Sequence, residues 1–559
     1  MKPFELRGLE IHTSRMWQLQ AVERAIDFMS RTGLNALIFH RNDLIDALVF
    51  PTRYFSSDLM WRRWPVRMHT IQNNRQYINR VVREAKAAGI AFYAQVKELW
   101  YPEELLELVP ELRNRDGSLC PNDPFWWEFL GSKMDELLSV VPDLAGVIVS
   151  PGTRESRVSI STNKCRCDRC ARSDAREWYT QLLNTMYRPL AEKGKTLVVR
   201  DFAYTAEQQS LILDAANACS DRIVIALKNT PHDFYPTFPT NPRIGHSGAH
   251  PQWVEFDTWG QFFGLGLFPV SVVEDMQDRI RYCHAQGVSG VWFRTDWEAM
   301  TEASSFNSLN MVNLFGGALL AGDSDTALDT IFRAWSEYGL SSALQSGTYF
   351  QVPVSPIPSA TERLKRFMRA SWQVMEKTVY VRGHLFHEDG MFPDSVRTAV
   401  AMMVEIHGRD DWEPGASRRV ELTQENLKVI FAEKEQAVQE VQALPGILRA
   451  DTLGLPSAFV QELEEMLDLY GYYVKGFKAC AAVIFLARLA QSTCKRADVQ
   501  AAARALEQLH SVRQEIVERL RGTRYPHYVY WMLDEQRLDL LGQDVESMLR
   551  AIDVQDREP

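Results

Sequence analysis

Residues 223–229 read Ile-Val-Ile-Ala-Leu-Lys-Asn, a short apolar run that ends in a lysine and an asparagine. Short runs rich in Val, Ile and Phe, separated by amphipathic segments, are typical of βα units and a parallel sheet. Seven further runs follow the same pattern, at residues 34–40, 90–97, 144–150, 196–201, 252–257, 265–269 and 290–296. Eight such units predict an α/β fold in which the strands close into a (β/α)₈ TIM barrel.

The barrel pattern extends over residues 1–345, and a different pattern occupies residues 346–559. Between them, Pro353, Pro356 and Pro358 fall in a short polar stretch that is typical of a linker. Beyond it, five segments are amphipathic with helical periodicity, at residues 360–376, 423–441, 458–492, 496–522 and 534–552. We therefore predict a catalytic barrel followed by a mostly α-helical C-terminal domain. Residues 383–394 are too rich in turn-forming and polar residues for a helix, and this loop could lean over the barrel mouth.

Composition narrows the classes of function. The 559 residues are 46% apolar and 24% charged, as in an ordinary globular protein. A net charge of −10 argues against a nucleic-acid surface. The N-terminus has no apolar core of signal-peptide length, and the longest apolar stretch, at 480–490, is too short to span a bilayer. Sparse cysteines fit a reducing compartment. We expect a cytoplasmic protein without nucleic-acid or membrane partners, and the helical domain offers a surface for a homodimer.

Three carboxylates lie at or just after predicted strand ends, where TIM barrels place their active sites: Glu155, Asp233 and Glu255. Glycoside hydrolysis needs one acid that protonates the leaving oxygen and a second carboxylate that activates water. Acids after strands also cap helices or pair with arginine, and for any single residue this is the commoner role. Three together, two of them with aromatic neighbours, favour a catalytic interpretation.

Two cations, Arg200 and Lys228, end neighbouring strands in this acidic mouth. They could hold a substrate carboxylate, the arginine in bidentate fashion, or pair with Asp201 or Asp233. Several aromatic residues near strand ends could stack on sugar rings, although any one tryptophan is more often part of a core. These residues are Trp100, Tyr101, Trp259, Trp292 and Trp297.

A cysteine cluster, Cys165, Cys167 and Cys170, forms a C-x-C-x-x-C motif in a basic stretch after the predicted strand at 144–150. Three thiolates at this spacing could hold a structural zinc ion if a fourth ligand, such as Cys120, arrived from elsewhere. Free thiols that cap a loop are the preferred alternative, because a strong zinc signature has two C-x-x-C pairs. No catalytic metal and no cofactor are expected.

Several ordered segments resemble one enzyme family, glycoside hydrolase family 67, the α-glucuronidases. Residues 121–127 (Pro-Asn-Asp-Pro-Phe-Trp-Trp) and 141–146 (Val-Pro-Asp-Leu-Ala-Gly) resemble the stretch before its general acid, and residues 199–204 (Val-Arg-Asp-Phe-Ala-Tyr) resemble a motif whose arginine contacts the uronic acid. Residues 228–234 (Lys-Asn-Thr-Pro-His-Asp-Phe) resemble a motif with a substrate-binding lysine and one of two base carboxylates. Residues 254–257 resemble the segment that contains the second base carboxylate. Residues 306–315 resemble a helix that follows the last strand.

The resemblance implies that Glu155 is the general acid, and that Asp233 and Glu255 activate water with inversion of configuration. Substrate binding would then fall to Arg200, Lys228, Asn229, Trp292 and Arg294. The chain also departs from the family: the N-terminal α/β domain is absent, Thr230 replaces a glycine, the residues beside Glu155 differ, and the cysteine cluster is additional. We interpret the chain as a divergent relative.

The expected function is an exo-acting glycoside hydrolase that removes an α-linked glucuronic or 4-O-methylglucuronic acid, or a related uronic acid, from an oligosaccharide, as in xylan degradation. Three alternatives stay open: the same barrel acting on a neutral or amino sugar, a non-catalytic carbohydrate-binding protein, and a metal-dependent barrel enzyme. The cations Arg200 and Lys228 argue against the first, the three carboxylates against the second, and strand ends poor in histidine against the third.

Overall fold

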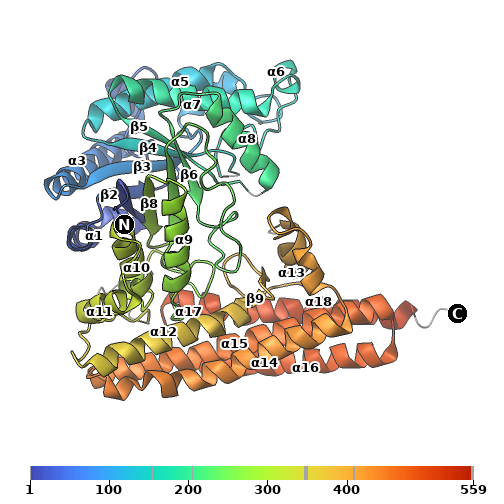
Figure 1. Cartoon of the computed structure of the whole chain (residues 1–559). Helices are drawn as coiled ribbons and strands as arrows, with labels where there is room; N and C mark the ends of the chain where they lie inside the picture. Colours follow the sequence, from blue (N-terminus) through green and yellow to red (C-terminus); the bar gives the residue numbers. More distant parts are fainter. Residues whose placement is uncertain (1, 154, 204, 345–350, 407–408, 556–559) are drawn as a thin grey trace.

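The computed structural model describes residues 2–153, 155–203, 205–344, 351–406 and 409–555. Its first part is a closed barrel of eight parallel strands in the order β1 to β8, and a helical region follows it (Figure 1). This confirms the predicted fold class. The strands are β1 (Leu6–Ile11), β2 (Ala36–His40), β3 (Ala91–Lys97), β4 (Gly146–Ser150), β5 (Thr196–Arg200), β6 (Val224–Lys228), β7 (Gln252–Asp257) and β8 (Gly290–Arg294).

Two strand predictions were wrong. One strand was missed and one was predicted where none forms, so the predicted number of eight strands still agrees with the structure. The first strand, β1, was missed, and it pairs with both β2 and β8 to close the barrel. Residues 265–269, predicted as a strand, instead form a turn-rich segment in which Leu265 has a φ of 48°. Its apolar side chains are buried because the helical region covers them: Phe268 stacks on Tyr470, with ring centroids 4.7 Å apart.

Helices connect most of the strands. The principal ones are α1 (Leu19–Thr32), α3 (Pro65–Ala87), α5 (Phe125–Val140), α7 (Ala175–Glu192), α8 (Ala206–Asn217), α9 (Val273–Ala285), α10 (Met311–Gly322) and α11 (Leu328–Tyr338). Short turns of helix occur in the loops, at α2 (Ser57–Arg63), α4 (Leu105–Leu108) and α6 (Asp168–Ala171). Between β6 and β7 the described residues 229–251 contain no helix, so a long loop passes over this part of the mouth.

Successive side chains along each strand point alternately into the barrel interior and outward to the helices, so the barrel has two hydrophobic layers. Side chains such as Leu6, Ile38 and Trp292 fill the interior, whereas Leu9 and Ile11 join the larger core between strands and helices. Gly8 lies opposite Trp292, and a Cβ at this position would come within 2.6 Å of the Trp292 Cβ. The glycine therefore makes room for the indole in a packed barrel interior.

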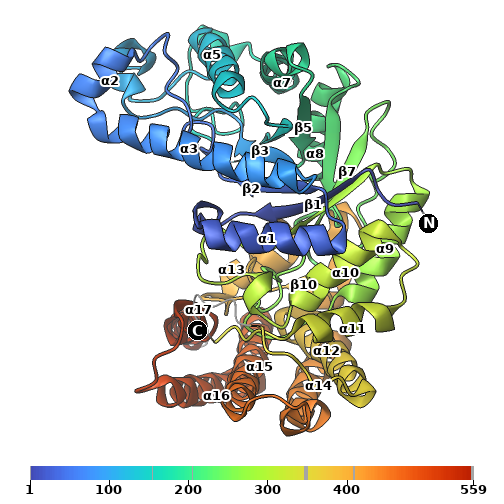
Figure 2. The same cartoon turned by 90° about the vertical axis from the view of Figure 1, so that its left-hand side faces the viewer.

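The helical region consists mainly of long helices that lie side by side beneath the barrel in Figure 1 and are seen end-on in Figure 2. They are α12 (Pro358–Val379), α14 (Gln424–Leu448), α15 (Ser457–Thr493), α16 (Arg496–Leu520) and α18 (Glu535–Gln555). The shorter elements are β9 (Tyr380–Val381), β10 (His384–Leu385), α13 (Val396–Ala401) and α17 (His527–Met532). Among the described residues, no helix has the length and hydropathy that crossing a membrane requires.

The segment after β10 reaches from the helical region to the barrel. Its anchors on the helical side are a hydrogen bond from the Tyr473 hydroxyl to the Gly390 carbonyl and an ion pair of 3.0 Å between Arg537 and Asp394. On the barrel side, Gln261 Nε2 donates to Asp389 Oδ1 at 3.0 Å. The predicted loop at 383–394 thus lies beside the barrel mouth. The division into domains at residue 345 stays a prediction, and residues 345–350 lie outside the described part of the chain.

Candidate active site

A cavity of about 180 Å³ lies at the carboxyl ends of the strands. Side chains from β2, β3, β5 and β8 line it together with the loops that follow the strands and the segment after β10. The lining residues are His12, His40, Lys97, Glu155, Arg200, Phe202, Asp233, Gln261, Phe262, Arg294, Trp297, Glu298, Glu388 and Asp389. Four predicted site residues, Glu155, Arg200, Asp233 and Arg294, therefore meet in one small chamber.

Glu155 stands on the long loop after β4 and is held from two sides. The Lys97 ammonium lies 3.2 Å from its Oε2, and the Asn42 amide donates to the same oxygen at 3.0 Å. Lys97 is buried, whereas the Glu155 side chain keeps 34% of its surface exposed. The carboxyl group is thus fixed in direction but open to the cavity, as proton transfer to a bound group requires.

Asp233 is held in a comparable way on the loop after β6. It pairs with Lys228, and His232 Nδ1 lies 3.3 Å from its Oδ2. Its backbone has a φ of 43°, in the left-handed region that a non-glycine residue seldom adopts. Such a conformation persists only where the surroundings enforce it, so the loop aims this carboxylate specifically.

The ring of Phe202 joins the two carboxylate–lysine pairs. The Lys97 and Lys228 ammonium groups each lie 4.1 Å from its centroid. Two cations at this distance gain cation–π attraction from one ring, and both lysine side chains are buried. Phe202 was not predicted as a site residue. Its place two residues after Arg200, beyond the end of β5, was the available signal.

Glu255 and Arg200 are paired with each other at the ends of β7 and β5. They form a bidentate pair, with Arg200 Nε 2.6 Å from Glu255 Oε2 and Nη2 2.9 Å from Oε1. Both side chains are buried, and Glu255 is not among the described residues that line the cavity. Glu255 is poorly placed to activate water because Arg200 binds both of its carboxylate oxygens. In return, Glu255 occupies the Nε–Nη2 edge of Arg200, and Arg200 Nη1 lies 3.4 Å from Ser150 Oγ.

Arg294, at the end of β8, is less fully paired. Its Nε lies 3.8 Å from Glu10 Oε1 and makes no hydrogen bond among the described residues, and its Nη2 lies 3.3 Å from His12 Nδ1. Burial alone would lower its pKa, but the carboxylates of Glu10 and Asp257 outweigh burial and raise it. The guanidinium is therefore a permanent positive charge on the cavity wall.

Trp292 and Asn229, both predicted to bind substrate, lie elsewhere. Trp292 is fully buried in the barrel interior, where its Nε1 donates to Glu10 Oε2 at 2.8 Å and its ring contacts Trp253 edge-on. Asn229 continues β6, and its backbone N–H donates to the Glu255 carbonyl at 2.9 Å. Neither is a described lining residue. This placement disagrees with the expected stacking of Trp292 on a sugar. Trp297, by contrast, does line the cavity.

Two histidines line the cavity that were not predicted as site residues: His12 follows the missed strand β1, and His40 ends β2, within the predicted run 34–40. They correct the view that the strand ends are poor in histidine. His12 and His40 stack with ring centroids 3.6 Å apart. Burial and, second to it, neighbouring positive charges lower the pKa of each well below its ordinary value, so both rings are neutral. His40 Nδ1 lies 2.8 Å from Glu10 Oε1, while its buried Nε2 has no partner among the described residues. It is free to accept a hydrogen bond from a substrate hydroxyl.

Glu10, His12 and His40 also have the spacing of a metal-ligand group. The cations Lys97, Arg200 and Arg294, which depress the pKa of these histidines, would repel a metal ion there. The group therefore fits a neutral hydrogen-bonding wall better than a cation site.

Two further carboxyl groups have strongly shifted pKa values. Burial raises the pKa of Asp389, on the segment after β10, to about 7. Burial also raises the pKa of Glu98 to about 7, and this residue accepts a hydrogen bond from the Gly152 backbone N–H. Glu98 N donates to Ser156 Oγ at 3.1 Å, so Glu98 ties both sides of Glu155 to the end of β3. Asp389 lines the cavity, whereas Glu98 acts on the loop behind it.

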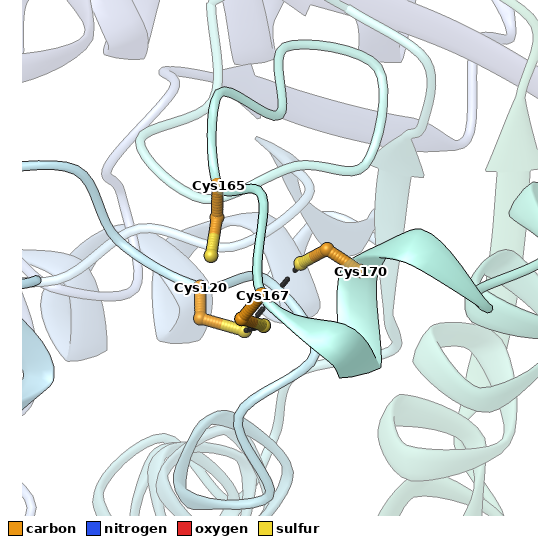
Figure 3. A group of neighbouring side chains, drawn as sticks. All are labelled: Cys120, Cys165, Cys167 and Cys170. Carbon is orange, nitrogen blue, oxygen red and sulfur yellow. Dashed lines mark hydrogen bonds between the residues drawn. The ribbon is translucent and has the colours of Figure 1, made fainter.

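The cysteines of the C-x-C-x-x-C motif also come together. Cys120, on a different loop, joins Cys165, Cys167 and Cys170, and the four sulfur atoms lie within 4.8 Å of one another (Figure 3). Cys120 was the suggested fourth partner, and the structure brings it to the other three.

Comparison with known proteins gives a partial match in sequence and a broader match in fold. The chain matches no protein-family model. It is 25% identical over 264 residues to alpha-glucuronidase A of Emericella nidulans, a match that covers 39% of this chain and only 28% of that protein. A GH138 enzyme targeting pectin rhamnogalacturonan II superposes with a TM-score of 0.67 at 11% identity, covering 99% of this chain and 85% of the other. This likeness shows that both parts of the fold, barrel and helices, occur together in a solved structure.

Proposed function

We propose that this protein is an inverting exo-glycoside hydrolase that removes an α-linked glucuronic or 4-O-methylglucuronic acid, or a related uronic acid, from oligosaccharides. The observation that carries the proposal is the pair Glu155 and Asp233. Each is ion-paired to a lysine, and both line one small cavity at the mouth of a TIM barrel. The partial match to an α-glucuronidase supports the same chemistry.

The size of the cavity favours removal of a single terminal sugar. Pockets for drug-sized ligands measure roughly 300–1,000 Å³. A chamber of about 180 Å³ is closer to one sugar ring than to an oligosaccharide. Exposed Glu298 and the segment with Glu388 and Asp389 border the same space, so the remainder of the substrate would extend outward between them.

In this mechanism the Glu155 carboxyl group donates its proton to the glycosidic oxygen as the bond to the anomeric carbon breaks. The Asp233 carboxylate takes a proton from a water molecule, whose oxygen bonds to the anomeric carbon from the opposite face. The Lys228 ammonium favours the ionised form of Asp233 that a base requires. The Lys97 ammonium favours the ionised form of Glu155 in the same way, so Glu155 must take up a proton before it can act as the acid. An inverting pair must leave room for water, so the two carboxyl groups should stand roughly 6.5–9.5 Å apart.

The substrate carboxylate would bind Arg294. Its guanidinium lines the cavity and has an Nε without a hydrogen-bond partner among the described residues, whereas Glu255 already occupies the Nε–Nη2 edge of Arg200. A buried arginine gains most from a bidentate carboxylate partner. Arg200 and Glu255 then act as positioning residues, because their pair fixes the floor beneath the substrate. Lys97 and Lys228 add positive charge behind Phe202.

A neutral or amino sugar is the second candidate. Three carboxyl groups, Glu298, Glu388 and Asp389, face the same cavity and would repel a uronate that approached them. The neutral rings of His12 and His40 suit sugar hydroxyls of either substrate class. The two candidates therefore differ in which wall binds the group at the sugar's C6, the Arg294 wall or the Asp389 wall.

A substrate panel distinguishes them. The protein is incubated with 4-nitrophenyl α-glucuronide, α-galacturonide, α-glucoside and α-N-acetylglucosaminide, and with short oligosaccharides that carry a terminal α-uronic acid. Released monosaccharide is measured by anion-exchange chromatography, with the Glu155→Gln, Asp233→Asn double variant as the blank. The proposal expects free uronic acid from the uronides and far less neutral sugar from the others. Turnover of the neutral or amino sugars alone would overturn it.

A further inference from the structure

The loop after β4 contains a cysteine cluster that no part of the proposed hydrolysis uses. Cys120 precedes α5, and Cys165, Cys167 and Cys170 lie between β4 and α7. Figure 3 shows the four side chains pointing toward one centre from two separate segments. Cys120 Sγ lies 3.6 Å from Cys167 Sγ and 3.5 Å from Cys170 Sγ, and all four sulfur atoms lie within 4.8 Å of one another.

These separations fit a tetrahedron around one metal ion. Zinc bound to thiolates has a Zn–S distance of about 2.3 Å, and tetrahedral geometry then places the sulfurs about 3.8 Å apart. The Cys120–Cys167 and Cys120–Cys170 distances, 3.6 and 3.5 Å, are close to this value. A disulfide would need an S–S distance of about 2.0 Å, and all four cysteines are free thiols in the structure. Pairing two of them would also leave the other two without a reason to converge.

Hydrogen-bond donors surround the sulfur atoms. The Asn114 and Asn122 amides donate to Cys165 Sγ at 3.4 Å and to Cys170 Sγ at 3.3 Å. Donors of this kind orient metal-bound thiolates and spread their charge, and they are weak partners for neutral thiols.

The local charge also suits a metal–thiolate centre. A Zn²⁺ ion with four thiolates carries a net charge of −2, which an acidic protein of net charge −10 would have to balance nearby. The motif is embedded among four basic residues, Lys164, Arg166, Arg169 and Arg172. Of these, Arg169 pairs with Asp123 at 3.0 Å, and this pair joins the two cysteine-bearing segments.

We propose that Cys120, Cys165, Cys167 and Cys170 bind one structural Zn²⁺ ion that joins the loop carrying Glu155 to the segment before α5. The loop between β4 and α7 has one four-residue helix, α6, as its only helix among the described residues 151–153 and 155–174, so it has little regular structure of its own. The Cys120 segment, in turn, is fixed by hydrogen bonds from Trp126 Nε1 to the Cys120 carbonyl at 3.0 Å and from Trp178 Nε1 to the Pro121 carbonyl at 2.9 Å. The ion would add a cross-link between these two segments.

The test measures metal content and its dependence on single cysteines. The full chain is expressed in zinc-supplemented medium, purified without chelators, and analysed by inductively coupled plasma mass spectrometry. The wild type should contain one zinc per chain. Cys120→Ser and Cys167→Ser should lose it, whereas Cys494→Ser, at an exposed cysteine outside the cluster, should retain it. Thermal melting should fall in the first two variants and not in the third.

A second measurement does not depend on the variants folding. Titration of the wild type with a mercurial reagent, in the presence of a zinc-sensitive dye, should release the ion as the four thiols react. Protein refolded with Co²⁺ should show thiolate–cobalt charge-transfer absorption. Wild type without zinc, bound iron in place of zinc, a disulfide within the cluster by mass spectrometry, or zinc that persists in both cluster variants would each overturn the proposal.

Discussion

Replacing Arg294 tests the substrate-recognition step most sharply, because the substitution should change selectivity rather than activity alone. Arg294 is 5% exposed and lines the cavity, and its Nε makes no hydrogen bond among the described residues. If it binds the uronate, Arg294→Met removes a charge-assisted hydrogen bond from the transition state for uronides. The transition state for a neutral glycoside loses only packing.

The expected change in selectivity follows from the free energy of the hydrogen bond between Arg294 and the uronate. A hydrogen bond to a charged group contributes about 1.5–3 kcal/mol, and each 1.36 kcal/mol corresponds to a tenfold change in rate. The kcat/KM for 4-nitrophenyl α-glucuronide should therefore fall about 10- to 150-fold more than that for the α-glucoside. Arg294→Lys keeps the charge but lacks the planar fork, so its ratio should lie between those of the wild type and Arg294→Met.

The assay compares kcat/KM for the two aryl glycosides in each variant, so that a loss of folded protein cancels in the ratio. The matched control is Arg200→Lys, which disturbs the buried pair with Glu255 and should lower both rates together. An unchanged ratio in Arg294→Met, or a shift confined to Arg200→Lys, would refute the assignment of the uronate to Arg294.

Three further substitutions test the remaining roles. Glu155→Gln should slow oligosaccharides, which have poor leaving groups, far more than activated aryl glycosides, and equal losses in steady-state kcat would point to another acid. Asp233→Ala should remove most activity on both. In Glu155→Gln, which keeps Asp233, added azide should give no product of retained configuration as judged by NMR, and an azide adduct with the substrate's own anomeric configuration would argue that Asp233 is a nucleophile. Glu98→Gln should alter the pH dependence of stability. Burial raises the pKa of Glu98 to about 7 from its ordinary value near 4.5. The wild type therefore loses the stability that protonated Glu98 contributes as the pH rises from the lower to the higher of these values. The melting temperature of Glu98→Gln relative to the wild type should therefore be higher at pH 8 than at pH 5, and a constant difference would contradict the shift.

The barrel could be predicted because most of its strands are fully buried and read as continuous apolar runs. The strand β1 was missed because Leu-Arg-Gly-Leu-Glu-Ile contains two charged residues and a glycine and so does not form a continuous apolar run. Its Glu10 is buried among His40, Trp292 and Arg294. Residues 265–269 were wrongly predicted as a strand for the opposite reason: they form an apolar run but are not part of the sheet. Their burial comes from α15, about two hundred residues later, and not from a sheet.

The candidate site likewise has features that the sequence could predict and features that it could not. The positions of Glu155 and Asp233 could be predicted, since residues after barrel strands face the mouth. The pairing of each cation with a particular carboxylate could not be predicted, because it depends on the direction in which each side chain points and not only on which residues are neighbours in the sheet. Lys228 stands opposite Glu255 in the sheet, yet Glu255 pairs with Arg200 and Lys228 with Asp233. The contribution of Asp389 depends on the packing of the helical region against the barrel.

The central claim is that Glu155 and Asp233 hydrolyse an α-linked uronide with inversion in this cavity. Proton NMR of the first-formed sugar tests it directly, using an aryl α-glucuronide, enough enzyme to outrun mutarotation, and the Glu155→Gln, Asp233→Asn double variant as the blank. The account predicts that the β-anomer of glucuronic acid appears first and then equilibrates. Initial release of the α-anomer would contradict it by requiring a covalent intermediate, and no release of glucuronic acid above the blank would contradict the activity itself.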